Sequence, residues 1–262
     1  LHAVFEVGGH YDWMYDLLMK HCTEVIVIAP GRKALKKTDQ LDAANLARDL
    51  WRGDLDGIFV PPKAMRDDRR LVARVHVLSK QIGRIKILMR DMLYTARLTC
   101  PKTDLGSDKA RDWLRTLALP QLEEQDRLLM EQLLDQLELF QKHYAALYAR
   151  AAQRLSSYSD AKIARSIPGF GPLVTLAVLS CIGQIGRFGT PDKLASYFGL
   201  CGRIDQSGDS LTIGGITRRG NRHVRWLIGQ AVTHLIRSDP KSRRRYMKLR
   251  RKKKPKVARV AL

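Results

Sequence analysis

The sequence lacks the features that mark secreted and membrane-spanning proteins. Its 262 residues include only four cysteines, and none of them forms a Cys-x-x-Cys pair. This argues against a disulfide framework and against the common zinc motifs. No apolar run approaches the roughly 18 residues of a membrane helix, and the first residues do not form a signal peptide. We therefore expect a reduced, cytoplasmic chain with no membrane partner.

Acidic residues are scarce in the last two-fifths of the chain. Residues 161–262 carry 22 Lys and Arg but only four acids, a net charge of +18, whereas residues 1–160 carry +3. The whole chain has a net charge of +21 and a pI near 10.2. Such an excess indicates a polyanionic partner, either nucleic acid or an anionic membrane surface.

Residues 1–62 alternate between strand and helix patterns. The predicted elements are residues 2–7, 11–21, 24–29 and 39–52. Strands that alternate with helices are typical of a parallel or mixed α/β sheet. A further extended piece is predicted to begin at residues 57–60. These strands are too few for a complete domain, and the chain opens on Leu1 instead of methionine. We expect that upstream residues, including a first strand, are missing.

Residues 63–158 have the pattern of two long helices. An unbroken heptad seam consists of Leu71, Val75, Leu78, Ile82, Ile85, Met89, Met92 and Ala96. A second apolar face, after Pro120, consists of Leu129, Leu133, Leu137, Phe140, Tyr144 and Leu147. The two stretches predict either an antiparallel helical hairpin or a coiled coil that dimerises. Such seams usually serve packing, so we expect a spacer or dimerising element.

Residues 159–240 predict a mostly helical domain, followed by a basic tail at residues 241–262 that we expect to be disordered. Gly169 and Gly171 lie in a short segment between two helical patterns. Such a segment is typical of a helix-hairpin-helix, whose turn binds backbone phosphate without reading base sequence. The alternative is a plain turn between helices. Thr190 and Asn221 are predicted to cap the two helices that follow.

Two aspartates near the start of the helix at residues 39–52 are candidate metal ligands. Asp39 and Asp42 lie on or beside its predicted inward face, where two anions need neutralisation. Mg²⁺ would supply it, because it prefers oxygen ligands. The alternative is a helix cap in which Asp39 is the N-cap residue and Asp42 occupies N3. Glu6 ends the first strand, and a carboxylate there either faces a site or is a surface residue.

Ser207 lies in a Gln-Ser-Gly sequence inside the basic part of the chain. Taken alone it is typical of a turn serine, and no histidine lies near it in sequence to complete a triad. A serine on a cationic surface could attack a phosphate if metal ions held that phosphate.

Two long motifs, in this order, resemble the DEDD-type transposases of insertion-sequence family 110, which includes site-specific DNA invertases. The first motif is FEVGGHYDWMYDLLMKHCTEVIVIAP followed by KKTDQLDAANLA, and the second runs from SIPGFGPLVTLAVL through KLASYFGLCGRIDQSGDS to NRHVRWLI. The resemblance implies a resolvase-like (RNase H-like) catalytic domain of class α/β, a helical hairpin and a helical C-terminal transposase domain. It covers nearly the whole chain.

The resemblance also implies roles for single residues. Glu6, Asp39 and Asp42 match the family's Mg²⁺ ligands, and Ser207 matches its serine nucleophile. The family's first aspartate would lie on a strand before Leu1. The residues expected to hold nucleic acid are Gly169, Gly171, Arg203, Arg218, Arg219, Arg222 and Arg225. A structured guide RNA and a homo-oligomer with active sites shared between protomers are further implications.

We therefore expect a DNA transposase or site-specific recombinase, associated with the prokaryotic nucleoid, that cleaves and rejoins DNA strands. Two alternatives remain open. One is a junction-resolving or hydrolytic nuclease that uses water in place of Ser207. The other is an inactive fragment that only binds nucleic acid.

Overall fold

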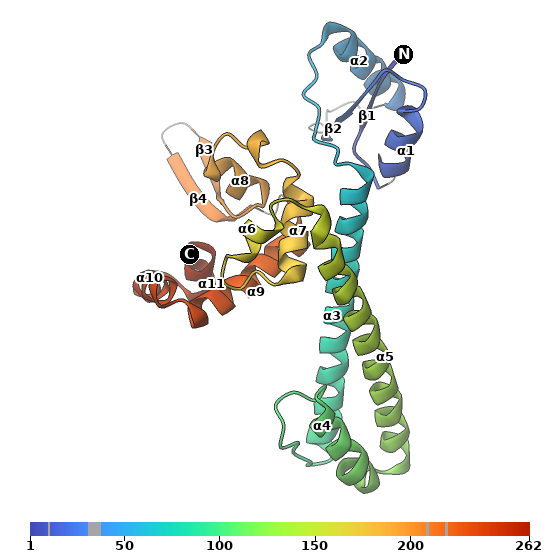
Figure 1. The fold of residues 1–262 in the computed structure, drawn as a ribbon, viewed down its shortest axis with the longest axis vertical. Helices are drawn as coiled ribbons and strands as arrows, with labels where there is room; N and C mark the ends of the chain where they lie inside the picture. The colour runs from blue at the N-terminus through green and yellow to red at the C-terminus, as the bar shows by residue number, and fades with distance from the viewer. Residues whose placement is uncertain (10, 31–37, 208–209, 218–219) are drawn as a thin grey trace. The chain divides into compact units, whose positions relative to one another are not determined.

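The structure is a computed structural model that describes all residues except 10, 31–37, 208–209 and 218–219. The chain divides into two units, Leu1–Pro62 and Lys63–Leu262, which are described separately below. Most of the described chain is helical, with two small sheets (Figure 1). None of the described helices has the length and apolar content needed to cross a membrane.

The first unit is an α/β arrangement, as the sequence predicts at the level of fold class. Its elements are β1 (His2–Glu6), α1 (Tyr11–Leu18), β2 (Glu24–Ile28) and α2 (Asp39–Arg52). The two strands pair in parallel, from His2 opposite Glu24 to Glu6 opposite Ile28. The β-branched residues of β2 favour a strand, and Val27, its fourth residue, is buried. Helix α2 packs against β1.

Helix α2 begins with a different cap from the one that we expected. Thr38 is the N-cap residue, and its hydroxyl accepts a hydrogen bond from the Leu41 amide. Asp39 is therefore the first helical residue, and the capping interpretation of Asp39 and Asp42 is wrong. Thr38 has the extended backbone angles of an N-cap residue, with φ −125° and ψ 143°, whereas Asp39 is already helical. The carboxylates thus need another explanation than a cap.

The second unit is built on a hairpin of two long helices, α3 (Lys63–Thr95) and α5 (Glu124–Arg154), which lie side by side (Figure 1). The predicted seam of α3 packs within the chain, and Val75, Leu78, Ile85 and Met89 are buried. On α5 one predicted core residue is wrong, because Leu129 is 42% exposed while its neighbour Met130 is fully buried. The seam thus serves the hairpin itself.

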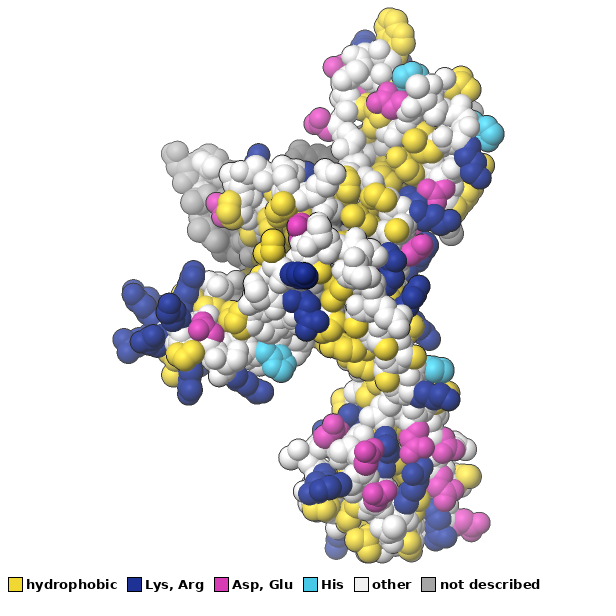
Figure 2. Space-filling model, viewed as in Figure 1, with side chains coloured by type: hydrophobic (Ala, Val, Ile, Leu, Met, Phe, Trp, Pro, Cys, Tyr) yellow, Lys and Arg dark blue, Asp and Glu magenta, His cyan; other side chains and the backbone are white. Residues whose placement is uncertain are grey.

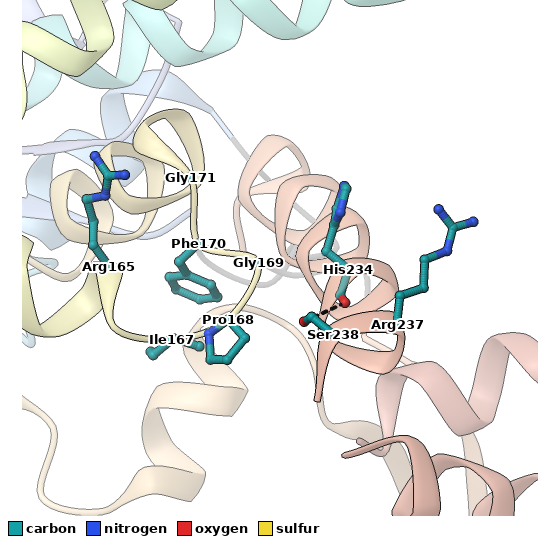
Figure 3. A pocket seen from close by; sticks show the side chains of 9 residues that line it. All are labelled: Arg165, Ile167, Pro168, Gly169, Phe170, Gly171, His234, Arg237 and Ser238. Atoms are coloured by element: carbon teal, nitrogen blue, oxygen red, sulfur yellow. Dashed lines mark hydrogen bonds between the residues drawn. The ribbon is translucent and has the colours of Figure 1, made fainter. Parts of the chain in front are cut away.

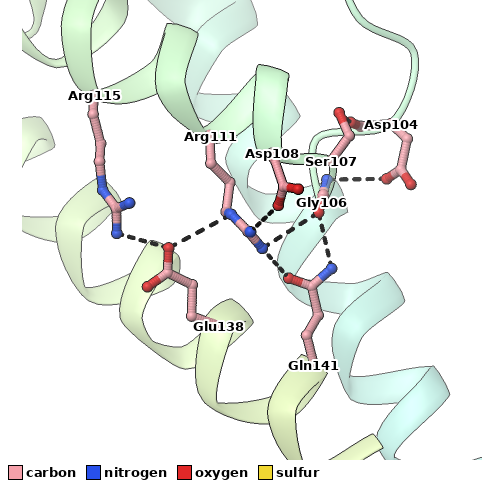
Figure 4. Close-up of polar contacts among 8 residues, drawn as sticks. All are labelled: Asp104, Gly106, Ser107, Asp108, Arg111, Arg115, Glu138 and Gln141. Atoms are coloured by element: carbon pink, nitrogen blue, oxygen red, sulfur yellow. Dashed lines mark hydrogen bonds and ion pairs between the residues drawn. The ribbon is translucent and has the colours of Figure 1, made fainter. Parts of the chain in front are cut away.

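The tip of the hairpin is closed by short helices and a polar network. The short elements are α4 (Asp108–Trp113), a π-helical turn η1 (Leu114–Ala118) and a 3₁₀ turn η2 (Leu119–Gln121). Arg111 donates to the Gln141 side-chain oxygen at 2.7 Å and also pairs with Asp108 and Glu138 (Figure 4). The Gln141 amide donates in turn to the Gly106 carbonyl. This network ties the connecting loop to α5.

A buried ion pair joins the base of the hairpin. The Asp68 carboxylate, only 3% exposed, accepts two hydrogen bonds from the Arg154 guanidinium at 2.8 and 3.1 Å. The Tyr158 hydroxyl donates to the same carboxylate at 2.8 Å. Burial and this hydrogen bond raise the pKa of Tyr158. Three donors satisfy the charge of Asp68, as a buried carboxylate requires.

The rest of the second unit packs around one apolar helix, α7 (Pro172–Ile182), in which every residue after Pro172 is buried. The flanking elements are η3 (Leu155–Ser157), α6 (Ala161–Arg165), η4 (Ile185–Arg187), α8 (Pro191–Tyr197) and α9 (Arg222–Ser238). Thr190 caps α8 and Asn221 caps α9, as the sequence predicts. Arg69 and Arg187 donate to the last carbonyls of α7 and so complete its C-terminal end.

A β-hairpin lies between α8 and α9. Strands β3 (Gly202–Ser207) and β4 (Ser210–Ile216) pair antiparallel, with an irregularity between Gly202 and Ile204. Taken alone, Ser207 is typical of a turn serine, but it is the last residue of β3. Gly214 and Gly215 lie within β4. The sequence Ser207-Gly208-Asp209, with Ile204 before it and Thr212 and Ile213 after it, is the signal that would have predicted a hairpin.

The basic end of the chain is helical instead of disordered. Its helices are α10 (Pro240–Arg250) and α11 (Pro255–Val260). Asp239 caps α10 by accepting a hydrogen bond from the Ser242 amide, and Pro240 occupies the first helical position. Ala258 of α11 is fully buried, and both helices contact α9. The expectation of disorder rested on charge alone, which does not take account of the Asp239 cap or of the contact that buries Ala258.

Candidate nucleic-acid interface

The turn between α6 and α7 packs tightly against α9. Gly169 has a φ of +90°, and a Cβ at this position would lie 2.5 Å from the Ala231 carbonyl oxygen. Glycine is therefore required both by the backbone conformation and by the close approach of the two segments. The predicted glycine turn between helices is present at this place, although α6 has only five residues.

The amides of this turn are partly used within the turn. The Phe170 amide donates to the Ile167 carbonyl at 3.0 Å, and the Gly171 amide donates to the Gly169 carbonyl at 3.1 Å. Two donors that a phosphate-binding helix-hairpin-helix would present are thus paired with backbone. Any anion at this turn would be held mainly by side chains, and the helix-hairpin-helix interpretation stays a prediction.

A pocket of about 610 Å³ opens beside the turn. Figure 3 shows Arg165 on one side of the glycine segment and His234 and Arg237, from the last turns of α9, on the other. Arg165 and Arg237 are exposed, and none of the described residues that line this pocket is acidic. Two guanidinium groups without an acidic neighbour favour the binding of a phosphate.

The predicted arginines lie at the other end of α9. Arg222 is exposed at the first turn, and Arg225 donates to the Phe198 and Gly220 carbonyls. Arg225 therefore holds loop backbone in addition to any role toward a ligand. Arg222 and Arg237 are separated by about 22 Å along the helix. The candidate phosphate contacts thus form two groups, one at each end of α9.

The other predicted residues of this unit lie on or near the β-hairpin. Arg203 is exposed at the irregularity of β3, where a bulge can redirect a side chain. Ser207 is the last residue of β3 and pairs with Ser210. Arg218 and Arg219 lie outside the described residues.

The sequence did not single out Arg165, His234 and Arg237 of the pocket. Arg165 and Arg237 are 72 positions apart, and only the packing of the glycine turn onto α9 brings them together. His234 and Arg237 do share a helix face, since they are three residues apart. That spacing was the one available signal, and it is weak.

The three predicted carboxylate ligands belong to the first unit. Glu6 ends β1, Asp42 is half-buried on α2, and Asp39 is exposed at the start of that helix. Their oxygens are of the kind that Mg²⁺ binds. Among the residues that the structure describes, however, no three His, Cys, Asp or Glu side chains form a group that could hold a metal ion. The donor chemistry fits Mg²⁺, but a complete ligand set is not assembled by this part of the chain.

Two histidines join α9 to the long hairpin. His76 of α3 lies 4.8 Å from His223 and 4.3 Å from Trp226 between ring centroids. Burial is the main cause that lowers the pKa of both histidines, and the nearby Lys80 and Arg222 lower it further. Both rings therefore favour the neutral form.

Comparisons with known proteins agree with the resemblance seen in the sequence. Residues 161–247 match the model of the transposase IS116/IS110/IS902 family. A protein of Sinorhizobium fredii named as a transposase is 28% identical over 86% of this chain and 56% of its own length. The transposase for insertion sequence element IS1111A of Coxiella burnetii is 35% identical over 30% of this chain and 21% of its own length. The chain thus spans about half of the first relative and less of the second.

Proposed function

We propose that the chain, whose residues 161–247 match the model of the transposase IS116/IS110/IS902 family, is a transposase of that family and that it cleaves and rejoins DNA strands with Ser207 as nucleophile. The observation that carries this proposal is the extent of the family match, residues 161–247, which includes Ser207 and the cationic pocket beside Gly169. A DNA partner also agrees with the net charge of +18 in residues 161–262.

The proposed step is a transesterification. The Ser207 Oγ attacks a backbone phosphorus, so an O–P bond forms while the bond from phosphorus to one sugar oxygen breaks. The serine hydroxyl loses its proton, and the leaving sugar hydroxyl gains one. Rejoining is the reverse step with a hydroxyl of another strand. No phosphodiester energy is lost to water, which is why a covalent intermediate suits strand exchange.

Phosphate positioning is the second part of the proposal. Arg165 and Arg237 beside the glycine turn, and Arg203 and Arg222 near the β-hairpin, would contact the DNA backbone. Such contacts fix orientation on DNA without reading sequence. Arg218 and Arg219 belong to the same proposed set by their position in the sequence.

The proposal includes Mg²⁺ at Glu6, Asp39 and Asp42. When bound, Mg²⁺ would offset negative charge on the reacting phosphate. A structured guide RNA and a homo-oligomer with shared active sites are part of the same proposal, and they rest on the family resemblance alone.

Ser207→Ala separates this proposal from a hydrolytic nuclease. A plasmid recombination assay compares the unaltered chain with its variants. The alanine variant should lose recombination entirely, whereas Ser210→Ala, on the opposite strand of the hairpin, should retain it. Continued strand cutting by Ser207→Ala would favour a nuclease that uses water. Absence of cutting in the unaltered chain would favour a protein that only binds nucleic acid.

Salt titration tests the phosphate contacts. DNA affinity should fall steeply with salt, and Arg165→Gln or Arg237→Gln should each reduce the slope of log affinity against log salt by about 1. Arg115→Gln at the hairpin tip is the control, because Arg115 pairs with Glu138. A slope that neither pocket variant changes would remove this pocket from the DNA interface.

A further inference from the structure

A second pocket lies between α9 and α11. Val224, Leu227 and Ala231 of α9 are buried in the core. Gly229 is exposed and Trp226 is half-buried beside His76, and both line this pocket of about 540 Å³. The volume is in the range of sites that bind small organic groups. None of the predicted functional residues except Arg225 lines it.

The lining of this pocket combines an apolar interior with positive charge. Ile228, Val232 and Leu235 provide aliphatic surface, and Trp226 provides an aromatic ring. Lys256 and Arg259 of α11 stand on either side of the buried Ala258, and no described lining residue is acidic. The charge favours an anion, and the aromatic and aliphatic surface favours a flat apolar body attached to it.

Gly229 gives a second, independent observation. It lies in the middle of α9, where glycine is the least favourable residue apart from proline. A Cβ added at this position would meet no atom within 4 Å, so packing inside the described chain does not require glycine. A ligand that approaches the helix backbone would require it.

We propose that this pocket receives an unpaired base of a nucleic-acid strand, with the base beside Trp226 and Gly229 and the adjoining phosphate on Lys256 and Arg259. The inference rests on the proposed function, since it assumes that this unit binds nucleic acid. The basic side chains of α10 and α11, dark blue in Figure 2, surround this end of the unit and would accompany the strand. A base in a strand is favoured over a free nucleotide because those cations extend beyond the pocket.

The test uses two DNA duplexes of equal length, one fully paired and one with a single unpaired 2-aminopurine. The chain should bind the bulged duplex roughly tenfold more tightly, and the fluorescence of 2-aminopurine should be quenched. Gly229→Leu should abolish both the preference and the quenching while it leaves the affinity for the paired duplex unchanged. Its melting temperature should rise, because leucine is a better helix former, so a loss of folding cannot explain the result.

Gly83→Leu is the matched control. Gly83 also lies inside a helix, α3, and a Cβ added there would meet no atom within 4 Å, but Gly83 does not line the pocket, so the preference for the bulge should persist. Equal affinity of the unaltered chain for both duplexes, or an unchanged preference in Gly229→Leu, would overturn the proposal. A change in oligomeric state on Gly229→Leu without a change in base preference would assign the pocket to a second copy and overturn it too. Failure to bind either duplex would contradict the proposed function instead.

Discussion

The two units of the chain differ in how much apolar surface they bury. In the described part of the first unit, only Val27 and Pro61 are buried, whereas Trp51 is 87% and Leu41 56% exposed. The second unit has two buried clusters, one around α7 and one in the outer half of the hairpin. Parallel sheets are normally covered on both faces. The difference indicates that the second unit carries its own core, whereas the first depends on further contacts.

The largest expected effect comes from separating the units. Residues 63–262 should fold alone and unfold cooperatively in urea, because the two buried clusters lie within them. Residues 1–62 should show no cooperative transition, since a two-stranded sheet is marginal by itself. Circular dichroism during urea titration measures both. A cooperative transition in residues 1–62 would contradict the claim that the first unit lacks a core of its own.

Within the second unit, the buried ion pair should matter most. Asp68→Ala leaves Arg154 and Tyr158 without their partner and should lower the free energy of unfolding by about 3–5 kcal/mol. Asp67→Ala removes the neighbouring carboxylate, which is 51% exposed and pairs with Arg70. It should cost no more than about 1 kcal/mol. Urea denaturation of residues 63–262 compares the two, and equal losses would contradict the account of this junction.

Helix caps give a smaller effect that can be compared across the two units. Asn221→Ala removes two hydrogen bonds at the start of α9 and should cost about 1 kcal/mol of unfolding free energy. Thr38→Ala removes the cap of α2, which should loosen the first unit with no effect on the melting of the second. Hydrogen exchange of the two helices distinguishes these results. Loss of protection in α9 on Thr38→Ala would contradict the separation of the units.

The smallest expected effect is a pH dependence of stability that arises where His76 of α3 contacts His223 of α9. The pKa values of His76 and His223 are lowered from 6.5 in the folded state, so the unfolded chain binds protons first as the pH falls. Their contribution to stability is present above pH 6.5 and is lost as the pH falls below it. The melting temperature of residues 63–262 should drop more between pH 7.5 and 5.5 than that of His76→Gln. The exposed His143→Gln is the control and should follow the unaltered chain.

Local patterns in the sequence predicted much of this fold. The seam on α3, the caps Thr190 and Asn221 and the span of α2 depend on residues within a few positions of one another. The sequence did not predict the pocket beside Gly169 or the pair of His76 and His223, because these join residues far apart in the chain. Leu129 was predicted to lie in the core, but its neighbour Met130 is the buried residue. Adjacent helical positions differ by about 100°, so an error in the predicted orientation of the apolar face changes which of the two is buried.

The candidate site was predicted less completely than the fold. Motif resemblance named Ser207 and the carboxylates, but it did not distinguish an arginine that holds backbone, such as Arg225, from one exposed beside a pocket, such as Arg237. The second pocket left only a weak sequence signal, a glycine inside a helix. Its role depends on the space around Gly229, which no spacing rule reveals.

The most direct test of the central claim is to trap the covalent intermediate. The chain should be incubated with DNA that carries an element end, and the protein–DNA adduct should be digested and analysed by mass spectrometry. The account predicts a phosphodiester link between DNA and Ser207, and no adduct with Ser207→Ala. Strand cleavage without any adduct, or an adduct on another residue, would contradict it.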